Sequence, residues 1–256
     1  MEAWKEFELN CNEYLNEKYG NYFTHLGFSD STVSDIKYEN GEKIFYIEAK
    51  MPSAQSGQFV LLPDYENKTF LFSPRNKTEL NENTDFIINY MNQKFDIYSN
   101  YGTSGEKIDI SQDVFGDWII NYYKQKGVEF FITKEKNFII FPIEKYKDYF
   151  FISANYRIKK SGSADVPLNR QQDVIKQLNL MNIQYELKNG FKLFSNQNLD
   201  GLKFSIGDSD YMIRKIKNNL YRIRKLSNTR NPNVIFSIKL IKEQDKEDLN
   251  NFLRSL

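Results

Sequence analysis

The spacing of apolar residues predicts an N-terminal helix followed by a β-hairpin. In residues 2–18, apolar side chains recur three or four positions apart, which is the spacing of one helix face. Residues 34–39 and 42–50 are both strand-like, and they flank the pair Asn40-Gly41. Asn-Gly between two strand-like runs is the strongest short signal for a hairpin. We therefore expect one amphipathic helix and then two paired strands.

Further along the chain, strand patterns alternate irregularly with helix patterns. Strand–turn–strand patterns lie at 58–73 and 128–141, a single strand at 148–158, and helical patterns at 83–95, 111–126 and 168–181. Short strands are predicted at 191–195, 202–207, 211–216, 220–226 and 234–240, and a short polar helix follows them. This order predicts an α+β fold with an α/β core and a strand-rich C-terminal part.

Charge is distributed unevenly along the chain. Residues 1–150 carry 16 Lys/Arg and 24 Asp/Glu, a balance of −8, whereas residues 151–256 carry 19 and 10, a balance of +9. A polyanion is the natural partner of the basic part. The Lys-Lys-Ser-Gly-Ser stretch at 159–163 is the best candidate boundary. We therefore predict a catalytic core in 1–160 and a basic DNA-recognition part in 161–256, with one continuous domain as the alternative.

The composition excludes several classes of site. The chain has one cysteine, Cys11, and one histidine, His25, so a disulfide framework and a Cys/His zinc site cannot be assembled. Residues 1–10 are acidic and amphipathic, unlike a signal peptide, and no apolar run approaches membrane-spanning length. These features predict a cytoplasmic protein that does not enter a membrane.

A carboxylate-x-lysine pattern suits the metal-dependent hydrolysis of a phosphodiester. A divalent cation neutralises the anionic oxygens and lowers the pKa of a bound water, Mg²⁺ prefers carboxylate oxygens, and a lysine can orient the water. The pattern Asp/Glu-x-Lys occurs at Asp35-Ile-Lys37, Glu48-Ala-Lys50, Glu66-Asn-Lys68 and Glu186-Leu-Lys188. Four matches in a chain this rich in charge mean that spacing alone does not select a site.

The hairpin is what singles out one of the four matches. A two-residue turn at Asn40-Gly41 would pair Asp35 with Tyr46 and make Glu48 a diagonal neighbour, about 7–8 Å away between backbones. Repulsion between the opposed Glu39 and Glu42 would open the turn to four residues in the same register. Side chains alternate between faces along a strand, so Asp35, Glu48 and Lys50 would share one face. Two carboxylates at that spacing can bind one cation. The alternative is an ordinary salt bridge on an exposed face.

These residues resemble the PD-(D/E)XK nucleases, because Asp35 and Glu48-Ala-Lys50 lie on a hairpin after an N-terminal helix. The segments MPSAQSGQFVLL and YRIKKSGS also resemble type II restriction endonucleases. Ser34 replaces the proline that names the superfamily. The resemblance implies a mixed sheet flanked by helices, with Mg²⁺ (or Mn²⁺ as a substitute) bound by Asp35, Glu48 and the Ala49 carbonyl. Lys50 would position the hydrolytic water.

The resemblance also implies further contacts to metal and DNA. A helix glutamate often lies near the metal in this superfamily, and Glu6 and Glu13 are the candidates here. Gln55 or Gln58 would reach the scissile phosphate, although both also fit an ordinary polar surface.

The basic part contains its own candidates for DNA contact. Residues 211–230 hold seven Lys/Arg and no acid, and they predict a hairpin that turns at Asn218-Asn219 with one apolar and one cationic face. Arginine suits guanine edges and phosphates. The alternative is a solvated basic surface. The predicted DNA-binding residues are Gln55, Gln58, Arg157, Lys159, Lys160, Ser161, Arg170, Gln171, Arg214, Arg222, Arg224, Lys225 and Arg230.

Three functions are consistent with these patterns. The first is a type II restriction endonuclease that cuts double-stranded DNA at a specific sequence, acts as a homodimer on a palindrome and has a cognate DNA methyltransferase. The second is a structure-specific nuclease of DNA repair or recombination. The third is a non-catalytic DNA-binding protein, which the intact set of Asp35, Glu48 and Lys50 disfavours.

Overall fold

The chain folds into two compact units. The computed structural model describes residues 3–27, 33–100, 102, 104–160, 163–226 and 230–256. Unit 1 comprises Met1–Arg157 and Pro232–Leu256, and unit 2 comprises Ile158–Asn231. The chain passes from unit 1 to unit 2 at Ile158, next to the boundary expected at 159–163. The division differs from the expected one at the far end, because the chain returns to unit 1 at Pro232 and its last strand pairs there.

Unit 1 contains a mixed five-stranded sheet. Its order is β1-β2-β3-β7-β8, in which β3 and β7 run parallel and the other neighbours run antiparallel. The strands are β1 (Phe23–His25), β2 (Ile36–Glu39), β3 (Ile44–Ala49), β7 (Val128–Lys134) and β8 (Phe138–Pro142). Strands β2 and β3 are the predicted hairpin, and the mixed sheet confirms the predicted fold class.

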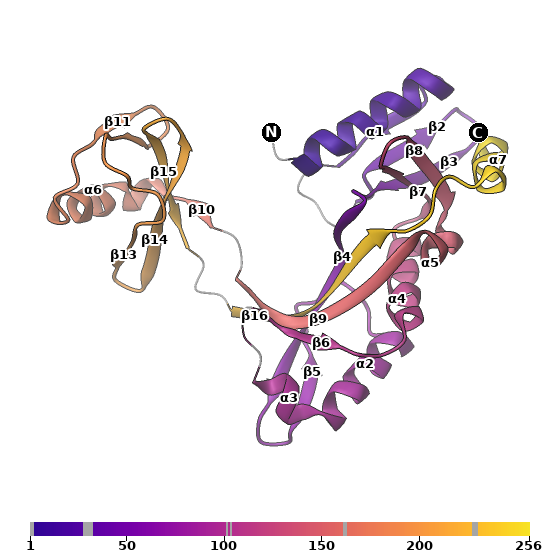
Figure 1. Cartoon of the computed structure of the whole chain (residues 1–256), viewed down its shortest axis with the longest axis horizontal. Coiled ribbons are helices and arrows are strands. Elements are labelled where there is room, and N and C mark those ends of the chain that lie inside the picture. Colours follow the sequence, from indigo (N-terminus) through magenta and orange to yellow (C-terminus); the bar gives the residue numbers. More distant parts are fainter. Residues whose placement is uncertain (1–2, 28–32, 101, 103, 161–162, 227–229) are drawn as a thin grey trace. The chain divides into compact units, whose positions relative to one another are not determined.

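Two helices cover one face of this sheet. Helix α1 (Ala3–Tyr19) buries Cys11 and Leu15, and helix α7 (Lys246–Ser255) buries Phe252. These side chains join one apolar cluster with Phe45 and Ile47 of β3. Figure 1 shows both helices next to this sheet. The apolar spacing that predicted α1 therefore marks the face that packs on the hairpin.

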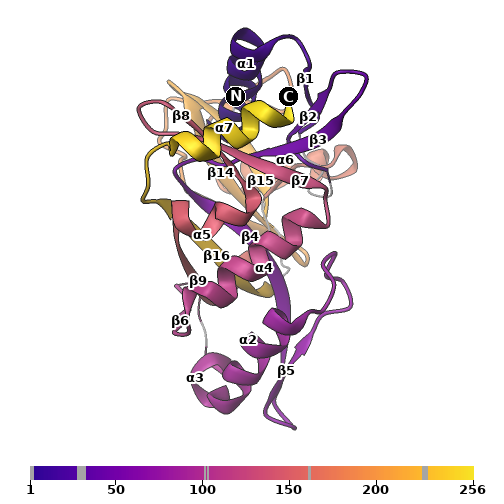
Figure 2. The ribbon, with the colours of Figure 1, turned by 90° about the vertical axis from the view of Figure 1, so that its right-hand side faces the viewer.

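A second sheet and four helices complete unit 1. The sheet order is β5-β4-β16-β9-β6. Its strands are β4 (Ser53–Asp64), β5 (Thr69–Phe72), β6 (Glu106–Ile108), β9 (Phe150–Lys160) and β16 (Arg230–Leu240), and the helices are α2 (Glu82–Gln93), α3 (Phe95–Ser99), α4 (Gln112–Lys124) and α5 (Tyr146–Tyr149). Helix α4 crosses this sheet in Figure 2 and buries Trp118 against Phe236 of β16. The same cluster reaches Phe131 of β7, so α4 also covers the other face of the first sheet.

A bulge bends strand β4 near its start. The pairing of β4 with β16 shifts between Ile235 and Ser237, opposite the stretch from Gln55 to Gln58. Gly57 adopts a φ of +130°, and a Cβ there would lie 2.7 Å from the Trp118 ring, so glycine is required. Residues three positions apart point to opposite faces of a regular strand. The bulge instead brings Gln55 and Gln58 together, with Gln55 Nε2 donating to Gln58 Oε1 at 2.7 Å.

Unit 2 is a small sheet covered by one helix. The sheet order is β11-β12-β15-β14-β13, and β10 adds to β15. Its elements are β10 (Ala164–Asp165), α6 (Gln171–Leu180), β11 (Glu186–Lys188), β12 (Lys192–Phe194), β13 (Lys203–Ile206), β14 (Ser209–Lys217) and β15 (Leu220–Lys225). Val174 and Leu178 of α6 pack on Tyr211, Ile213 and Tyr221 of the sheet. In the part of the chain that is described, no helix is long and apolar enough to cross a membrane.

Candidate active site

The β2–β3 hairpin places Asp35 and Glu48 together, but in a different register from the predicted one. Ile36 pairs with Ile47, so the turn spans four residues, 40–43. The Asn40 side chain stabilises this longer turn by accepting hydrogen bonds from the Glu42 and Lys43 amides at 3.0 and 2.9 Å. A shift of two positions leaves every side chain on its face. Continuing the observed register places Asp35 directly opposite Glu48, closer than the predicted diagonal arrangement.

The three predicted metal ligands converge on the Lys50 ammonium. Lys50 Nζ bonds to Glu48 Oε1, lies 3.8 Å from Asp35 Oδ2 and donates to the Ala49 carbonyl at 3.4 Å. Asp35 Oδ2 also accepts a hydrogen bond from the Ala49 amide at 3.0 Å. Lys50 itself is held by its own amide, which donates to Ile132 O of β7 at 2.9 Å. One cation therefore already occupies the point at which the oxygen atoms meet.

This cluster is buried, which excludes the alternative of an exposed salt bridge. Glu48 is only 4% exposed, and its Oε2 atom has no hydrogen-bond partner. A buried carboxylate oxygen without a partner costs free energy unless a ligand or cation completes it. Among the described residues, no group of three or more His, Cys, Asp or Glu side chains is placed to hold a metal. A metal here would depend on the two carboxylates and the Ala49 carbonyl.

The pKa values of Asp35, Glu48 and Lys50 all lie above their ordinary values. Desolvation raises the pKa of Glu48 to about 7, even though Lys50 opposes the shift. Desolvation also raises the pKa of Asp35. For Lys50, burial acts to lower the pKa, but the negative charge of Glu48 outweighs it, so the pKa lies well above its ordinary value. Lys50 stays protonated at neutral pH, and Glu48 takes up a proton more readily than a surface glutamate does.

The raised pKa of Glu48 predicts how the metal-free protein responds to pH. A carboxyl whose pKa is higher in the folded state binds a proton preferentially there. Protonated Glu48 therefore stabilises the folded state below pH 4.5, and this stabilisation is lost as the pH rises through about 7. We expect the free energy of unfolding to fall over this range by about 1–3 kcal/mol from Glu48. Urea unfolding at several pH values, without metal, should show a smaller fall for Glu48→Gln. Equal falls in both proteins would contradict the assignment.

Helix α1 contributes a third carboxylate that the sequence did not reveal. Glu6 and Glu13, the two candidates, are exposed, whereas Glu8 is buried and lies 3.3 Å from His25 Nε2. A Cβ at Gly27 would lie 2.8 Å from Glu8 Oε2, 3.1 Å from His25 Nε2 and 3.3 Å from Asp35 Oδ1. Because Gly27 has no side chain, space remains between the carboxylates of Glu8 and Asp35. The helical spacing alone could have indicated Glu8, because it lies one turn before Cys11 on the buried face.

Helix α4 brings an aromatic ring to the site, and the turn that follows it brings a second lysine. The buried Tyr123 ring lies 5.3 Å from Lys50 Nζ and 5.0 Å from Lys126 Nζ, so two ammonium groups contact one ring. The Lys126 carbonyl accepts a hydrogen bond from Ser34 Oγ at 3.3 Å, next to Asp35. No ion pair of Lys126 is found among the described residues. No spacing in the sequence connects Ser34 with Lys126, which lies 92 positions away, and the parallel pairing of β3 with β7 brings the two segments together.

The rival Asp/Glu-x-Lys motifs form ordinary pairs. Lys37 pairs with Glu39 at 2.6 Å on the exposed surface, and Lys188 pairs with Glu186 at 2.7 Å. Lys68 lies in the turn between β4 and β5 and is 3.8 Å from Asp96. Glu48-Ala-Lys50, the match that the hairpin geometry indicated, is therefore the one whose lysine meets two buried carboxylates.

The structure assigns the predicted DNA-binding residues to both units. In unit 1, Gln55 and Gln58 meet at the β4 bulge and Arg157 lies on β9. Arg170 pairs with Asp173, and Arg224 pairs with Asp165 and bonds to the Ser163 carbonyl and hydroxyl, so these two side chains have partners within unit 2. Gln171 opens α6, and Lys225 is half-buried on β15. Ser161 and the side chains of Lys159, Lys160 and Arg230 lie outside what the structure describes.

Four cations form a row across the sheet of unit 2, which we call the cationic row: Lys188, Lys192, Arg222 and Arg214. Lys188 pairs with Lys192, Lys192 with Arg222, and Arg222 with Arg214, on four neighbouring strands. Directly opposed residues share a face, and opposed like charges are destabilising. Strands lie about 4.8 Å apart, so the row spans roughly 14 Å. Within the described chain, Lys192, Arg214 and Arg222 have no ion-pair partner.

Comparison with known proteins assigns the family. No protein-family model matches the chain, and no curated protein does. The solved structure of HhaI endonuclease in complex with DNA matches with a TM-score of 0.88 and 44% sequence identity, covering 99% of this chain and 98% of that one. The fold thus defines the class as the restriction endonucleases. The chain belongs to the family of HhaI endonuclease and is a type II site-specific deoxyribonuclease.

Proposed function

We propose that this enzyme is a Mg²⁺-dependent PD-(D/E)XK endonuclease that cuts double-stranded DNA at a specific sequence. The observation that carries the proposal is the convergence of Asp35, Glu48 and the Ala49 carbonyl on one buried ammonium. The similarity to an endonuclease solved in complex with DNA supports DNA as the substrate. Sequence-specific cutting is favoured over the structure-specific alternative by that family membership.

The residues at the site fit a hard divalent cation. Carboxylate and carbonyl oxygens are the ligands that Mg²⁺ prefers, and Mn²⁺ accepts the same set. The unpartnered Glu48 Oε2 and the point occupied by Lys50 Nζ both indicate where positive charge is needed. Asp35, Glu48 and the Ala49 carbonyl would hold the ion, with Glu8 close to Asp35. When bound, Mg²⁺ supplies charge neutralisation at the phosphate and a water of lowered pKa.

Lys50 acts on the water and on the charge that develops at the phosphate. Its raised pKa keeps the ammonium charged, so it donates hydrogen bonds and does not act as a base. A protonated amine held near both carboxylates can orient the attacking water and stabilise the anionic transition state. The Tyr123 ring limits where the side chain can lie, because it packs against the Lys50 ammonium. Lys126 adds a second positive charge beside the same ring.

Digestion of DNA of known sequence tests the cleavage proposal. The purified protein with Mg²⁺ should convert several plasmids into discrete fragments whose ends share one short sequence. Smearing would favour a nuclease without sequence preference, and preferred cutting of branched DNA would favour the repair-type alternative. No cutting under any metal, together with retained DNA binding, would support the non-catalytic alternative.

The symmetry of a palindromic site favours a homodimer, because two related active sites would then meet the two strands. Sedimentation of the protein with and without DNA measures this directly. A dimer should convert supercoiled plasmid mainly to linear product. Accumulation of nicked circles by a monomeric species would contradict the dimer. A DNA methyltransferase of the same specificity is the expected partner, because cutting at short sequences would otherwise damage the host.

We further propose that unit 2 binds the DNA backbone through the cationic row. Unit 2 carries 14 Lys/Arg and 6 Asp/Glu, a balance of +8, although the whole chain has only +1. Each phosphate contact that is lost lowers the slope of log K against log salt concentration by about 0.9. Replacing Lys192, Arg214 and Arg222 by Gln should therefore reduce the slope by up to about 2.7.

A matched variant controls for the change in net charge. Lys68, Lys107 and Lys145 of unit 1 each pair with an aspartate, so replacing these three by Gln removes the same charge from positions that already have acidic partners. Fluorescence anisotropy with a duplex at 50 to 300 mM salt should show an unchanged slope for this control. Equal slopes for both triple variants would refute a specific role of the cationic row.

A further inference from the structure

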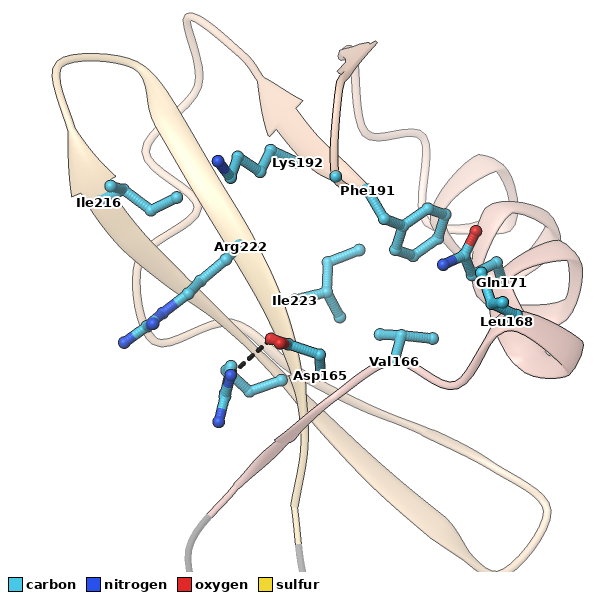
Figure 3. Close-up of a pocket in the computed structure, with 11 residues that line it drawn as sticks. Asp165, Val166, Leu168, Gln171, Phe191, Lys192, Ile216, Arg222 and Ile223 are labelled. Carbon is cyan, nitrogen blue, oxygen red and sulfur yellow. Dashed lines mark hydrogen bonds and ion pairs between the residues drawn. The ribbon is translucent and has the colours of Figure 1, made fainter. Parts of the chain in front are cut away.

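A pocket of about 630 Å³ opens beside the cationic row in unit 2. It lies between strand β15, the turn that joins β11 to β12, and the start of helix α6. Figure 3 shows Lys192, Arg222 and Ile216 on one side of the pocket and Phe191, Gln171 and Leu168 on the other, with Val166 and Ile223 between them. The pocket therefore has a cationic end, an apolar floor, and an end with an aromatic ring and an amide.

The charge at the cationic end is available to a ligand. Arg224 also lines the pocket, but it pairs with Asp165 and bonds to the Ser163 hydroxyl at 3.0 Å, so this arginine and this aspartate neutralise each other. Lys192 and Arg222 are exposed, lie directly opposite each other on β12 and β15, and have no acidic partner in the described chain. The net charge that faces the pocket is therefore +2, which suits a phosphate.

The remaining walls suit a flat apolar group. Leu168 is 85% exposed and Ile216 is 43% exposed, although both are large apolar side chains. Phe191 adopts a φ of +54°, a left-handed conformation that is unusual for a bulky residue. Strained backbone of this kind often occurs at binding sites. Gln171 presents an amide, which can donate and accept hydrogen bonds along the edge of a base.

We propose that this pocket binds a nucleoside monophosphate unit. The phosphate would bond to Lys192 and Arg222, and the base would pack against Phe191 and Leu168 with its edge at Gln171. The volume lies within the range of about 300–1,000 Å³ of pockets that take small ligands. The unit is either a free nucleotide or an unpaired nucleotide of DNA. The pocket lies wholly within unit 2, so the proposal extends the function beyond cleavage and does not depend on the active site of unit 1.

Titration of the full-length Lys50→Ala protein, without metal, tests the proposal and separates it from cleavage. NMR chemical shifts of residues 190–192 and 222–223 are followed with a deoxynucleoside 5′-monophosphate, with the nucleoside and with inorganic phosphate. We expect saturable shifts with the nucleotide, and binding at least tenfold weaker for the nucleoside and the phosphate, because each lacks half of the ligand. A duplex with one unpaired nucleotide is compared with the fully paired duplex to distinguish the two sources.

The chain offers one cation of the pocket as the variant and one cation outside it as the control. Arg222 lines the pocket, whereas Lys203 has the same charge, is exposed on β13 and belongs neither to the pocket nor to the cationic row. Arg222→Gln should weaken nucleotide binding about tenfold to a hundredfold, as expected for a lost hydrogen bond from a charged group, and Lys203→Gln should change it less than threefold. Thermal unfolding of both variants checks the fold. Equal weakening by both, or no shifts at millimolar nucleotide, would overturn the proposal.

Discussion

Replacing Lys50 by alanine should lower the rate of DNA cleavage about a thousandfold, in line with the loss of a preorganised donor at a reacting phosphate. DNA binding should be retained, because the residues proposed to contact the backbone lie elsewhere. The measurement is single-turnover cleavage of a short duplex alongside binding of the same duplex. Lys50 forms ion pairs with two buried carboxylates, so alanine also leaves those charges without their partner. Lys50→Gln keeps the volume and serves as a second variant.

Another Asp/Glu-x-Lys match, outside the candidate active site, provides a control for the loss of a lysine. Lys68 belongs to Glu66-Asn-Lys68, matches the same pattern and is exposed in a turn. Its φ of +52° is tolerated by asparagine, so Lys68→Asn removes the charge without straining the turn. This variant should cut at the normal rate. Cleavage by Lys50→Gln at a rate similar to that of Lys68→Asn would refute the proposed role of Lys50.

Glu48→Gln should strongly reduce both cleavage and stabilisation by metal. The wild-type protein should become more stable in 10 mM Mg²⁺ or Mn²⁺, by about 1–3 kcal/mol if the metal is present at ten to a hundred times its dissociation constant. The amide of glutamine is uncharged and a weaker ligand, so this variant should lose most of that gain. Its cleavage rate should fall at least a hundredfold. Thermal unfolding with and without metal measures metal binding independently of the cleavage activity.

Two controls separate metal binding from a general effect of removing an acid. Glu66→Gln changes an exposed turn residue and should keep both the metal-dependent gain in stability and the cleavage rate. Lys50→Gln should keep the gain, or increase it, because the ammonium occupies the point at which the carboxylates meet. Metal stabilisation of Glu48→Gln equal to that of the wild type would place the metal elsewhere.

The predicted elements agreed with the structure where a local pattern controls local conformation. The helix at 2–18 and the hairpins at 34–50, 58–73, 128–141 and 211–226 were all predicted from periodicity and turn residues. The predicted register of the β2–β3 hairpin was wrong by two positions. The Asn40 side chain bonds to the backbone of the turn, and this favours four residues over the two that Asn-Gly usually supports. Because the shift is even, Asp35 and Glu48 still lie on one face, as strand alternation predicted.

The sequence by itself determined which carboxylates and which lysine share a face, because strand alternation depends only on residue number. It also determined the contrast in charge between the acidic and basic parts. Only the tertiary structure decided that Asp35 and Glu48 are buried beside the Lys50 ammonium, that Glu8 and not Glu6 or Glu13 approaches them, and that Tyr123 packs on Lys50. Tertiary pairing likewise returned Pro232–Leu256 to unit 1. These features depend on contacts between segments far apart in the chain, which no local spacing encodes.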